Sequence, residues 1–384
     1  MDLVIKKNAL VVPQTLYKDF GAGMGQFAHG VVRDQGDPDY FAHMRNGKAF
    51  INEKLQARHL QEQPEKLAGK WLYLGGLHNH FGHFLAECIH RIWAWHEYRD
   101  QCSGVLFLPN IKQFELGHHL PGYSKAILDF LGLEESAIRY VTQLTEVEEL
   151  LVPEPGSQLF VAAKADYIKF LATLKLAQRL HREALPSGYT PKVFVSRKKY
   201  RMNGSIAGLD VLENSLQQEG YFIFYPENYP IAVQLKVYQE AEKIIFEEGS
   251  AVHLLELFAK IKADVLLIKR RPSSRSFDCV FKPRTKCYIK YIDVMTPPPL
   301  TSAKFADVNA LSLTDLDNLG QFLVAQGFAS AALAIPLDWR DKVKADILGY
   351  LLKNARLESP SMDEFIVGYL QSIDDFFQQT DNPA

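Results

Sequence analysis

Residues 71–99 read WLYLGGLHNHFGHFLAECIHRIWAWHEYR, and this stretch gives the clearest indication of the class of fold. Its first part, WLYLGG, is an apolar run that ends in two glycines, which is typical of a buried strand followed by a tight turn. The next part, residues 81–99, spaces its apolar side chains as a helix does. A strand joined by a short turn to a helix is the repeating unit of α/β proteins, so the stretch predicts an α/β fold.

The same alternation continues on both sides of LPSGYTP, a cluster of helix-breaking residues at positions 185–191. Before it, residues 158–183 have the spacing of one long amphipathic helix. After it, five apolar runs alternate with helical patterns, which predicts a doubly wound sheet. We therefore expect an N-terminal α/β domain with its linking helix over 1–185, a Rossmann-like domain over 190–296, and a helical appendage over 301–384 that packs on the first domain or on a partner chain.

The composition is that of a globular protein. The chain has 384 residues and a net charge of −2, so no strongly basic surface indicates a nucleic-acid partner. Its four cysteines form no CxxC pair, which argues against a disulfide framework or a zinc ribbon. No apolar run approaches the roughly 20 residues that span a bilayer. We expect a cytoplasmic protein without a transmembrane segment, and leave open peripheral membrane contact and oligomerisation through the C-terminal helices.

Histidines are concentrated in the helical part of the opening stretch. Four of the 12 histidines of the chain lie within residues 78–90. On one continuous helix, His83, Glu87 and Arg91 would share a face, with His90 beside them. This pattern predicts a polar stripe next to the end of a strand.

Three interpretations of this stripe compete. It could be an active site, because histidine and glutamate are suited to proton transfer. It could be a metal site formed by His78, His80, His83 and Glu87, although the spacing matches no standard zinc signature. It could also be a helix face that only meets water.

Two loops in the second half carry candidate phosphate contacts. The first follows the strand KVFVS and contains Arg197, Lys198 and Arg201. Cations at the C-terminal ends of parallel strands are well placed to bind a diphosphate. The alternative is a solvated basic loop.

The second loop lies in KIIFEEGSAVHLLEL. Gly249 would permit a tight turn, and Ser250 and Ala251 would begin a helix whose backbone N–H groups favour phosphate. Glu248 could accept ribose hydroxyl groups, and His253 would lie in the first turn. The alternative is an ordinary strand-to-helix turn.

Residues 79–93, NHFGHFLAECIHRIW, resemble the N-terminal hallmark N-Y-x-H-W-L-x-E-x-L-P-R-x-W of glycosyltransferase family 61. The matching positions are Asn79, His83, Phe84, Leu85, Glu87, Arg91 and Trp93. The second half follows the order of the family's later motifs, with VFVSRKK, LENSLQQEGYFIFYPE, AVQLKVYQEAEKIIF and EGSAVHLLELF. The likeness covers roughly residues 70–295.

This resemblance implies a GT-B-like fold, in which two Rossmann-like domains face a cleft. It implies an inverting transfer of a hexosyl or pentosyl group from a nucleotide diphosphate sugar to a glycan acceptor, without a metal cofactor, in capsule or surface polysaccharide synthesis. The base would be His83 or Glu87, and we favour His83 with Glu87 orienting its ring. The implied substrate contacts are Asn79, His80, Arg91, Arg197, Lys198, Arg201, Glu248, Gly249, Ser250, Ala251 and His253.

Two other classes of function remain as alternatives. One is a nucleotide- or sugar-binding protein without catalytic activity. The other is a metal-dependent hydrolase that uses His78, His80 and His83.

Overall fold

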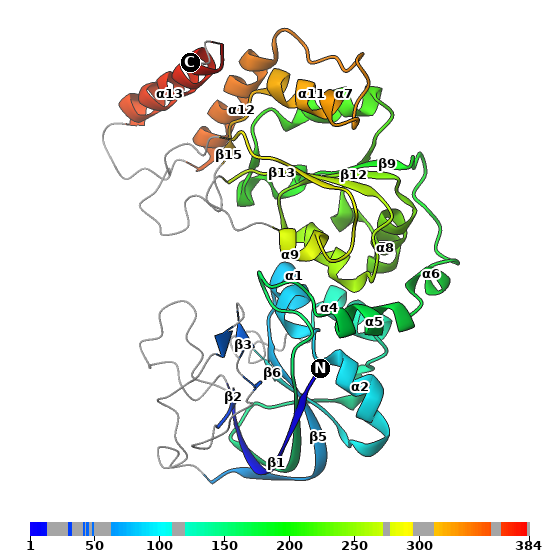
Figure 1. Ribbon diagram of the computed structural model, residues 1–384. Coiled ribbons are helices and arrows are strands. Elements are labelled where there is room, and N and C mark those ends of the chain that lie inside the picture. The colour runs from blue at the N-terminus through cyan, green and yellow to red at the C-terminus, as the bar shows by residue number, and fades with distance from the viewer. Residues whose placement is uncertain are drawn as a thin grey trace. The chain divides into compact units, whose positions relative to one another are not determined.

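The computed structural model divides into two compact units, each built on its own sheet (Figure 1). Unit 1 comprises Met1–His181, His253–Lys260 and Ser276–Arg284, and unit 2 comprises Arg182–Val252, Ile261–Arg275 and Thr285–Ala384. The structure describes residues 1–13, 30–32, 41–42, 44–45, 48–49, 63–109, 120–271, 277–294, 311–354 and 362–381. Unit 1 is therefore not one continuous segment, because it includes two stretches from the second half of the chain.

Unit 1 contains a six-stranded mixed sheet in the order β2-β1-β8-β5-β6-β7. Its strands are β1 (Leu3–Val12), β2 (Gly30–Val31), β5 (Glu65–Leu77), β6 (Gly104–Pro109), β7 (Ile138–Tyr140) and β8 (Thr145–Pro153). Strands β8, β5, β6 and β7 run parallel, while β1 is antiparallel to its neighbours β8 and β2. A separate two-stranded ribbon pairs β3 (Met44–Arg45) with β4 (Lys48–Ala49).

The predicted strand WLYLGG is confirmed as part of β5, but its glycines do not form a turn. Gly75 has a φ of 98° and lies where the pairing between β5 and β6 shifts register. A Cβ atom on Gly75 would lie 3.0 Å from Nη1 of Arg91. The glycine thus makes a bulge inside the strand and leaves room for that guanidinium group.

The helices of unit 1 are mostly short. Among the described residues they include α1 (Phe81–His83), the π-helix η3 (Phe84–Cys88), α2 (Ile92–Tyr98), η4 (Arg99–Gln101), α4 (Gly122–Phe130), η5 (Glu135–Ala137), α5 (Ala165–Thr173), α6 (Leu176–Arg179) and α9 (Asp278–Phe281). The prediction of one long helix over residues 158–183 is wrong. Residues 158 and 161 form an isolated antiparallel bridge, and Lys175 adopts a left-handed backbone conformation between α5 and α6.

Unit 2 contains the doubly wound sheet that the sequence predicts. Its five strands are β9 (Lys192–Val195), β11 (Phe222–Phe224), β12 (Lys243–Glu247), β13 (Asp264–Ile268) and β14 (Tyr288–Tyr291). All are parallel and lie in the order β11-β9-β12-β13-β14. Numbered along the chain, this is the 2-1-3-4-5 order of flavodoxin-like folds, which bind ligands at the C-terminal ends of the strands.

Helices cover both faces of this sheet (Figure 1). The helix α7 (Leu209–Gln218) packs on one face, where its Leu212 shares a core with Phe194 and Ile245 of the strands. On the other face, Tyr238 of α8 (Ile231–Glu240) contacts the ring of Phe246 edge-on. Because neighbouring residues of a strand point to opposite faces, Ile245 and Phe246 serve these two layers.

The segment predicted as a separate appendage belongs to unit 2. Its elements are β15 (Leu311–Ser312), α11 (Leu316–Ala325), α12 (Trp339–Asn354) and α13 (Met362–Asp381). Strand β15 pairs with β10 (Ser205–Ile206), and Leu316, Trp339 and Phe377 join the same core as α7. The segment is therefore not a separate appendage, because its apolar faces complete the core of unit 2, and its contact with a partner chain stays a prediction.

No helix in the described part of the chain is both long enough and apolar enough to cross a membrane. All four cysteines of the chain are free.

Candidate active site

The histidine-rich stretch of unit 1 is not one continuous helix. After β5, the chain forms one turn of α1, continues as the π-helix η3 and resumes as α2 only at Ile92. In a π-helix each backbone hydrogen bond spans five residues, whereas in an α-helix it spans four. Side chains beyond the π-helix therefore leave the face that α-helical spacing predicts. The predicted common face of His83, Glu87 and Arg91 is therefore wrong for Arg91.

His83 and Glu87 do form a close pair. Nδ1 of His83 lies 2.5 Å from Oε1 of Glu87. The side chain of His83 is 41% exposed, while that of Glu87 is only 12% exposed. The carboxylate thus fixes one ring nitrogen of a histidine whose ring is accessible, which is the arrangement of an oriented general base.

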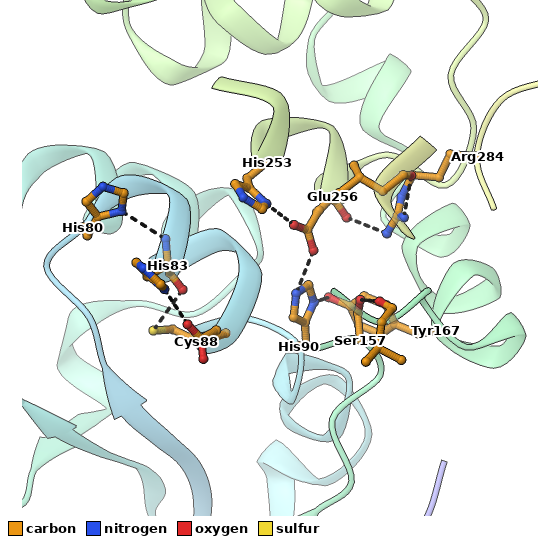
Figure 2. A network of polar contacts seen from close by, with 12 residues as sticks. His80, His83, Cys88, His90, Ser157, Tyr167, His253, Glu256 and Arg284 are labelled. Carbon is orange, nitrogen blue, oxygen red and sulfur yellow. Dashed lines mark hydrogen bonds and ion pairs between the residues drawn. The ribbon is translucent and has the colours of Figure 1, made fainter. Parts of the chain in front are cut away.

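Two more histidines surround this pair. The ring centroids of His78 and His80 lie 5.6 and 5.1 Å from that of His83. Nδ1 of His80 accepts a hydrogen bond from the backbone N–H of His83 (Figure 2). The N–H of His78 donates to Sγ of Cys88. Within the described residues, no group of three or more His, Cys, Asp or Glu side chains is arranged to hold a metal ion.

Arg91 and Asn79, predicted as substrate contacts, lie in different surroundings. Arg91 is only 6% exposed, and its guanidinium group donates to the carbonyl oxygens of Pro153 and Phe41. It therefore ties β8 to the segment around residue 41 and does not line an accessible stripe. Asn79 is exposed, and its Oδ1 accepts a hydrogen bond from the hydroxyl of Tyr123.

A second polar network lies in unit 1 around Glu256 (Figure 2). Oε1 of Glu256 lies 2.6 Å from Nδ1 of His253, and Oε2 lies 2.9 Å from Nε2 of His90. The contact with His90 is poorly aligned for a hydrogen bond, so its attraction is mainly electrostatic. His90 also contacts the hydroxyl of Tyr167 through Nδ1, at 3.2 Å.

Glu256 is held in its ionised form. Burial alone would raise its pKa, but the hydrogen bond from His253 and the attraction of His90 outweigh burial and lower the pKa to about 2. Arg284 supports the same segment, since it donates hydrogen bonds to the carbonyl oxygens of Glu256, Phe258 and Val280. A buried carboxylate shared by two imidazole rings is therefore a fixed part of unit 1.

In unit 2, the acidic residues that end β12 are fully buried. Glu247 accepts hydrogen bonds from the hydroxyl of Ser205 and the N–H of Arg197, and burial raises its pKa. Glu248 pairs with Arg271 at 2.7 Å and accepts from the N–H of Arg270. Glu248 is 0% exposed and paired with these cations, and its predicted contact with ribose stays a prediction.

The predicted cations of the first loop do not converge on one point. Arg197 is partly buried and donates to the carbonyl oxygens of Gly204 and Asn203. The other two cations pair with acids elsewhere: Lys198 with Asp210 and Glu213, and Arg201 with Asp346 of α12. In this structure these side chains hold the loop and the C-terminal helices in place.

The turn around Gly249 is tighter than the sequence suggests. A Cβ atom there would lie 2.1 Å from Nη1 of Arg197, so a side chain at this position would displace the guanidinium group. The following segment, η8 (Ser250–Leu257), is a 3₁₀ helix and not the predicted α-helix. Ser250 and Ala251 are partly exposed at its start, and His253 lies one turn further along.

Glu256 and the buried position of His90 were not predicted as site features. Glu256 reads in the sequence as one acid in an apolar helix, with no motif around it. Its spacing of three residues from His253 was the only available signal, since residues at i and i+3 on a helix are neighbours.

Residues 81–266 match the family model described as Glycosyltransferase 61, which is just under half of the chain. Comparison with curated proteins gave no match. The matched segment begins at α1 and contains the His83–Glu87 pair as well as His90, His253 and Glu256. The resemblance noted in the sequence is thus confirmed over residues 81–266, which are similar to glycosyltransferase family 61.

Proposed function

We propose that this protein is an inverting glycosyltransferase that moves a hexosyl or pentosyl group from a nucleotide diphosphate sugar to a hydroxyl group of a glycan acceptor. The match of residues 81–266 to the Glycosyltransferase 61 model supports glycosyltransferase activity in general. The observation that carries the finer proposal is the His83–Glu87 pair, which lies at the start of the matched segment with an accessible ring.

His83 is the proposed general base. Because Nδ1 faces Glu87, Nε2 is the ring nitrogen that would accept the proton of the acceptor hydroxyl. The acceptor oxygen then attacks the anomeric carbon, and the bond to the diphosphate breaks with its electron pair on the diphosphate oxygen. Attack from the opposite side inverts the anomeric centre. The reverse assignment, with Glu87 as the base, is the alternative that mutation distinguishes.

Unit 2 supports the donor side of the proposal. Its parallel 2-1-3-4-5 sheet is of the kind that binds nucleotides at the C-terminal ends of its strands. A GT-B enzyme needs two α/β units, and the chain has two. Ser250 and Ala251, which are partly exposed at the start of η8, would offer backbone N–H groups to a diphosphate without a metal ion. We place the reaction in the cytoplasm, in the synthesis of a surface polysaccharide.

A panel of nucleotide diphosphate sugars, screened for thermal stabilisation of the full chain, tests this proposal. A donor at about 100 times its dissociation constant adds about 2.7 kcal/mol to the free energy of unfolding, a clear upward shift of the melting temperature. The stabilising donor is then incubated with oligosaccharide acceptors, and the anomeric proton of the product is followed by NMR. Stabilisation by no donor, or a product with retained configuration, would contradict the proposal.

A further inference from the structure

Among the described residues of unit 1, two histidine–glutamate pairs meet through Nδ1 of the imidazole. In each, Nδ1 of the imidazole faces a glutamate oxygen, at 2.5 Å for His83 and Glu87 and at 2.6 Å for His253 and Glu256. In each, Nε2 is the nitrogen that points away from the carboxylate. The proposed transfer requires two catalytic functions. One is a base that deprotonates the acceptor, and the other is stabilisation of the leaving diphosphate. The first pair supplies only one of them.

The second pair is more enclosed than the first. The side chain of His253 is 12% exposed, and its ring packs edge-on against Phe277 at a centroid distance of 5.1 Å. The carboxylate therefore fixes the ring in one orientation and keeps the proton on Nδ1. On the 3₁₀ helix η8, His253 follows Ser250 and Ala251 by one turn.

Glu256 has more charged or titratable neighbours than a structural role requires. Charged or titratable groups from four other parts of unit 1 face it. They are His90 from the turn before α2, Tyr167 from α5, Cys279 from α9, and Arg284 beyond α9. With Arg284 cationic and Glu256 anionic, this group of side chains is near neutral when both imidazoles are uncharged. A proton on His253 would make it cationic, which favours a nearby anion.

We propose that His253 is a second catalytic residue, whose Nε2–H contacts the diphosphate of the donor and stabilises the charge that develops on it. Glu256 is its positioning residue, and His90 with Tyr167 holds Glu256. The inference rests on the proposed function, because it assumes a diphosphate leaving group.

The chemistry balances without a further reactant. As the bond between the anomeric carbon and the diphosphate oxygen breaks, its electron pair stays on that oxygen. The imidazolium of His253 donates a hydrogen bond to the diphosphate, and the proton on Nδ1 remains with the ring facing Glu256. His253 therefore binds the diphosphate best when protonated, so binding should draw a proton from solution.

Calorimetric titration of the full chain with UDP, GDP, CDP and ADP tests this inference. The tightest of these probes is titrated at pH 7.5 in two buffers of different ionisation enthalpy, which gives the number of protons taken up. We expect net uptake of up to one proton by the unmodified chain. His253→Gln should abolish the uptake and weaken binding about tenfold or more, the scale of a hydrogen bond to a charged group. Glu256→Gln should reduce both.

Two matched variants complete the experiment. His83→Gln should bind the diphosphate with unchanged affinity but lose transfer, and His181→Gln, at an exposed histidine, should behave as the unmodified chain. Folding of every variant is checked by circular dichroism. If Glu256→Gln does not fold, His253→Gln decides the question alone.

The outcomes separate the two proposals. Unchanged affinity and proton uptake in His253→Gln overturn this inference and leave the proposed function standing. Loss of transfer in His253→Gln with unchanged diphosphate affinity also overturns it, since His253 would then act on the acceptor. If none of the four diphosphates binds the unmodified chain, both proposals fail.

Discussion

His90 and Arg91 are neighbours in the sequence but serve different parts of unit 1. His90 faces Glu256, whereas Arg91 donates to carbonyl oxygens of Pro153 and Phe41. At this scale the sequence predicted the His83–Glu87 contact, because a spacing of four residues is a local property. It did not predict the contact of His90 with Glu256, which depends on how distant segments fold together.

Arg91 should be important for stability. Arg91→Ala removes the hydrogen bonds that the guanidinium group donates to these carbonyl oxygens. The free energy of unfolding should therefore fall by about 2–4 kcal/mol. Urea denaturation measures this change. Arg99→Ala, at an arginine whose side chain is 54% exposed, is the control and should change stability little. Equal stability of both variants would contradict the role given to Arg91.

The depressed pKa of Glu256 predicts how stability depends on pH. Because the folded value is about 2 and the ordinary value is 4.5, the ionised carboxylate stabilises the fold fully above pH 4.5. This contribution, on the order of 3 kcal/mol, is lost as the pH falls from 4.5 towards 2. The difference in unfolding free energy between the unmodified chain and Glu256→Gln should therefore shrink over that range. A constant difference would mean that the carboxylate is not ionised in the folded state.

At the scale of elements, the strands were predicted well and the helices less well. Short apolar runs between glycines and prolines identify buried strands whatever surrounds them, as β6 and β9 illustrate. The pattern of side chains does not distinguish α-, π- and 3₁₀-helices, since all three place apolar residues every three to five positions. The π-helix η3 and the 3₁₀ helix η8 were missed for this reason.

The junction between β12 and η8 should tolerate only glycine at position 249. Gly249→Ala would place a Cβ against the guanidinium group of Arg197, which holds the carbonyl oxygens of Asn203 and Gly204. We expect a loss of about 1–3 kcal/mol in the free energy of unfolding. The control is Gly122→Ala at the start of α4, where no atom lies within 4 Å of the added Cβ, and it should be neutral or slightly stabilising. Thermal denaturation of both variants measures the difference.

At the scale of the whole molecule, the C-terminal helices differ most from their predicted position. Their amphipathic pattern predicted that they need cover, but not which surface supplies it. The core of unit 2 contains Leu316, Trp339 and Phe377 together with residues of the sheet, so these helices are part of that unit. The sequence could not reveal this, because the spacing of apolar residues shows that a helix face is buried but not which surface it packs against.

Removal of the C-terminal segment should therefore unfold unit 2. A chain that ends at Val294 exposes the face of the sheet that holds Phe194 and Ile245. We expect it to aggregate or to lose cooperative unfolding of that unit, measured by size-exclusion chromatography and circular dichroism. A soluble truncated chain with a sharp unfolding transition would contradict the assignment of these helices to the core.

The central claim is that His83, oriented by Glu87, is the base of a sugar transfer. The most direct test is the turnover number of His83→Ala with the donor and acceptor found by screening. We expect a fall in kcat of about 10²–10⁴-fold with little change in donor affinity, and a smaller loss for Glu87→Gln. An unchanged kcat in His83→Ala would contradict the claim, and a larger loss in Glu87→Gln would assign the base to Glu87.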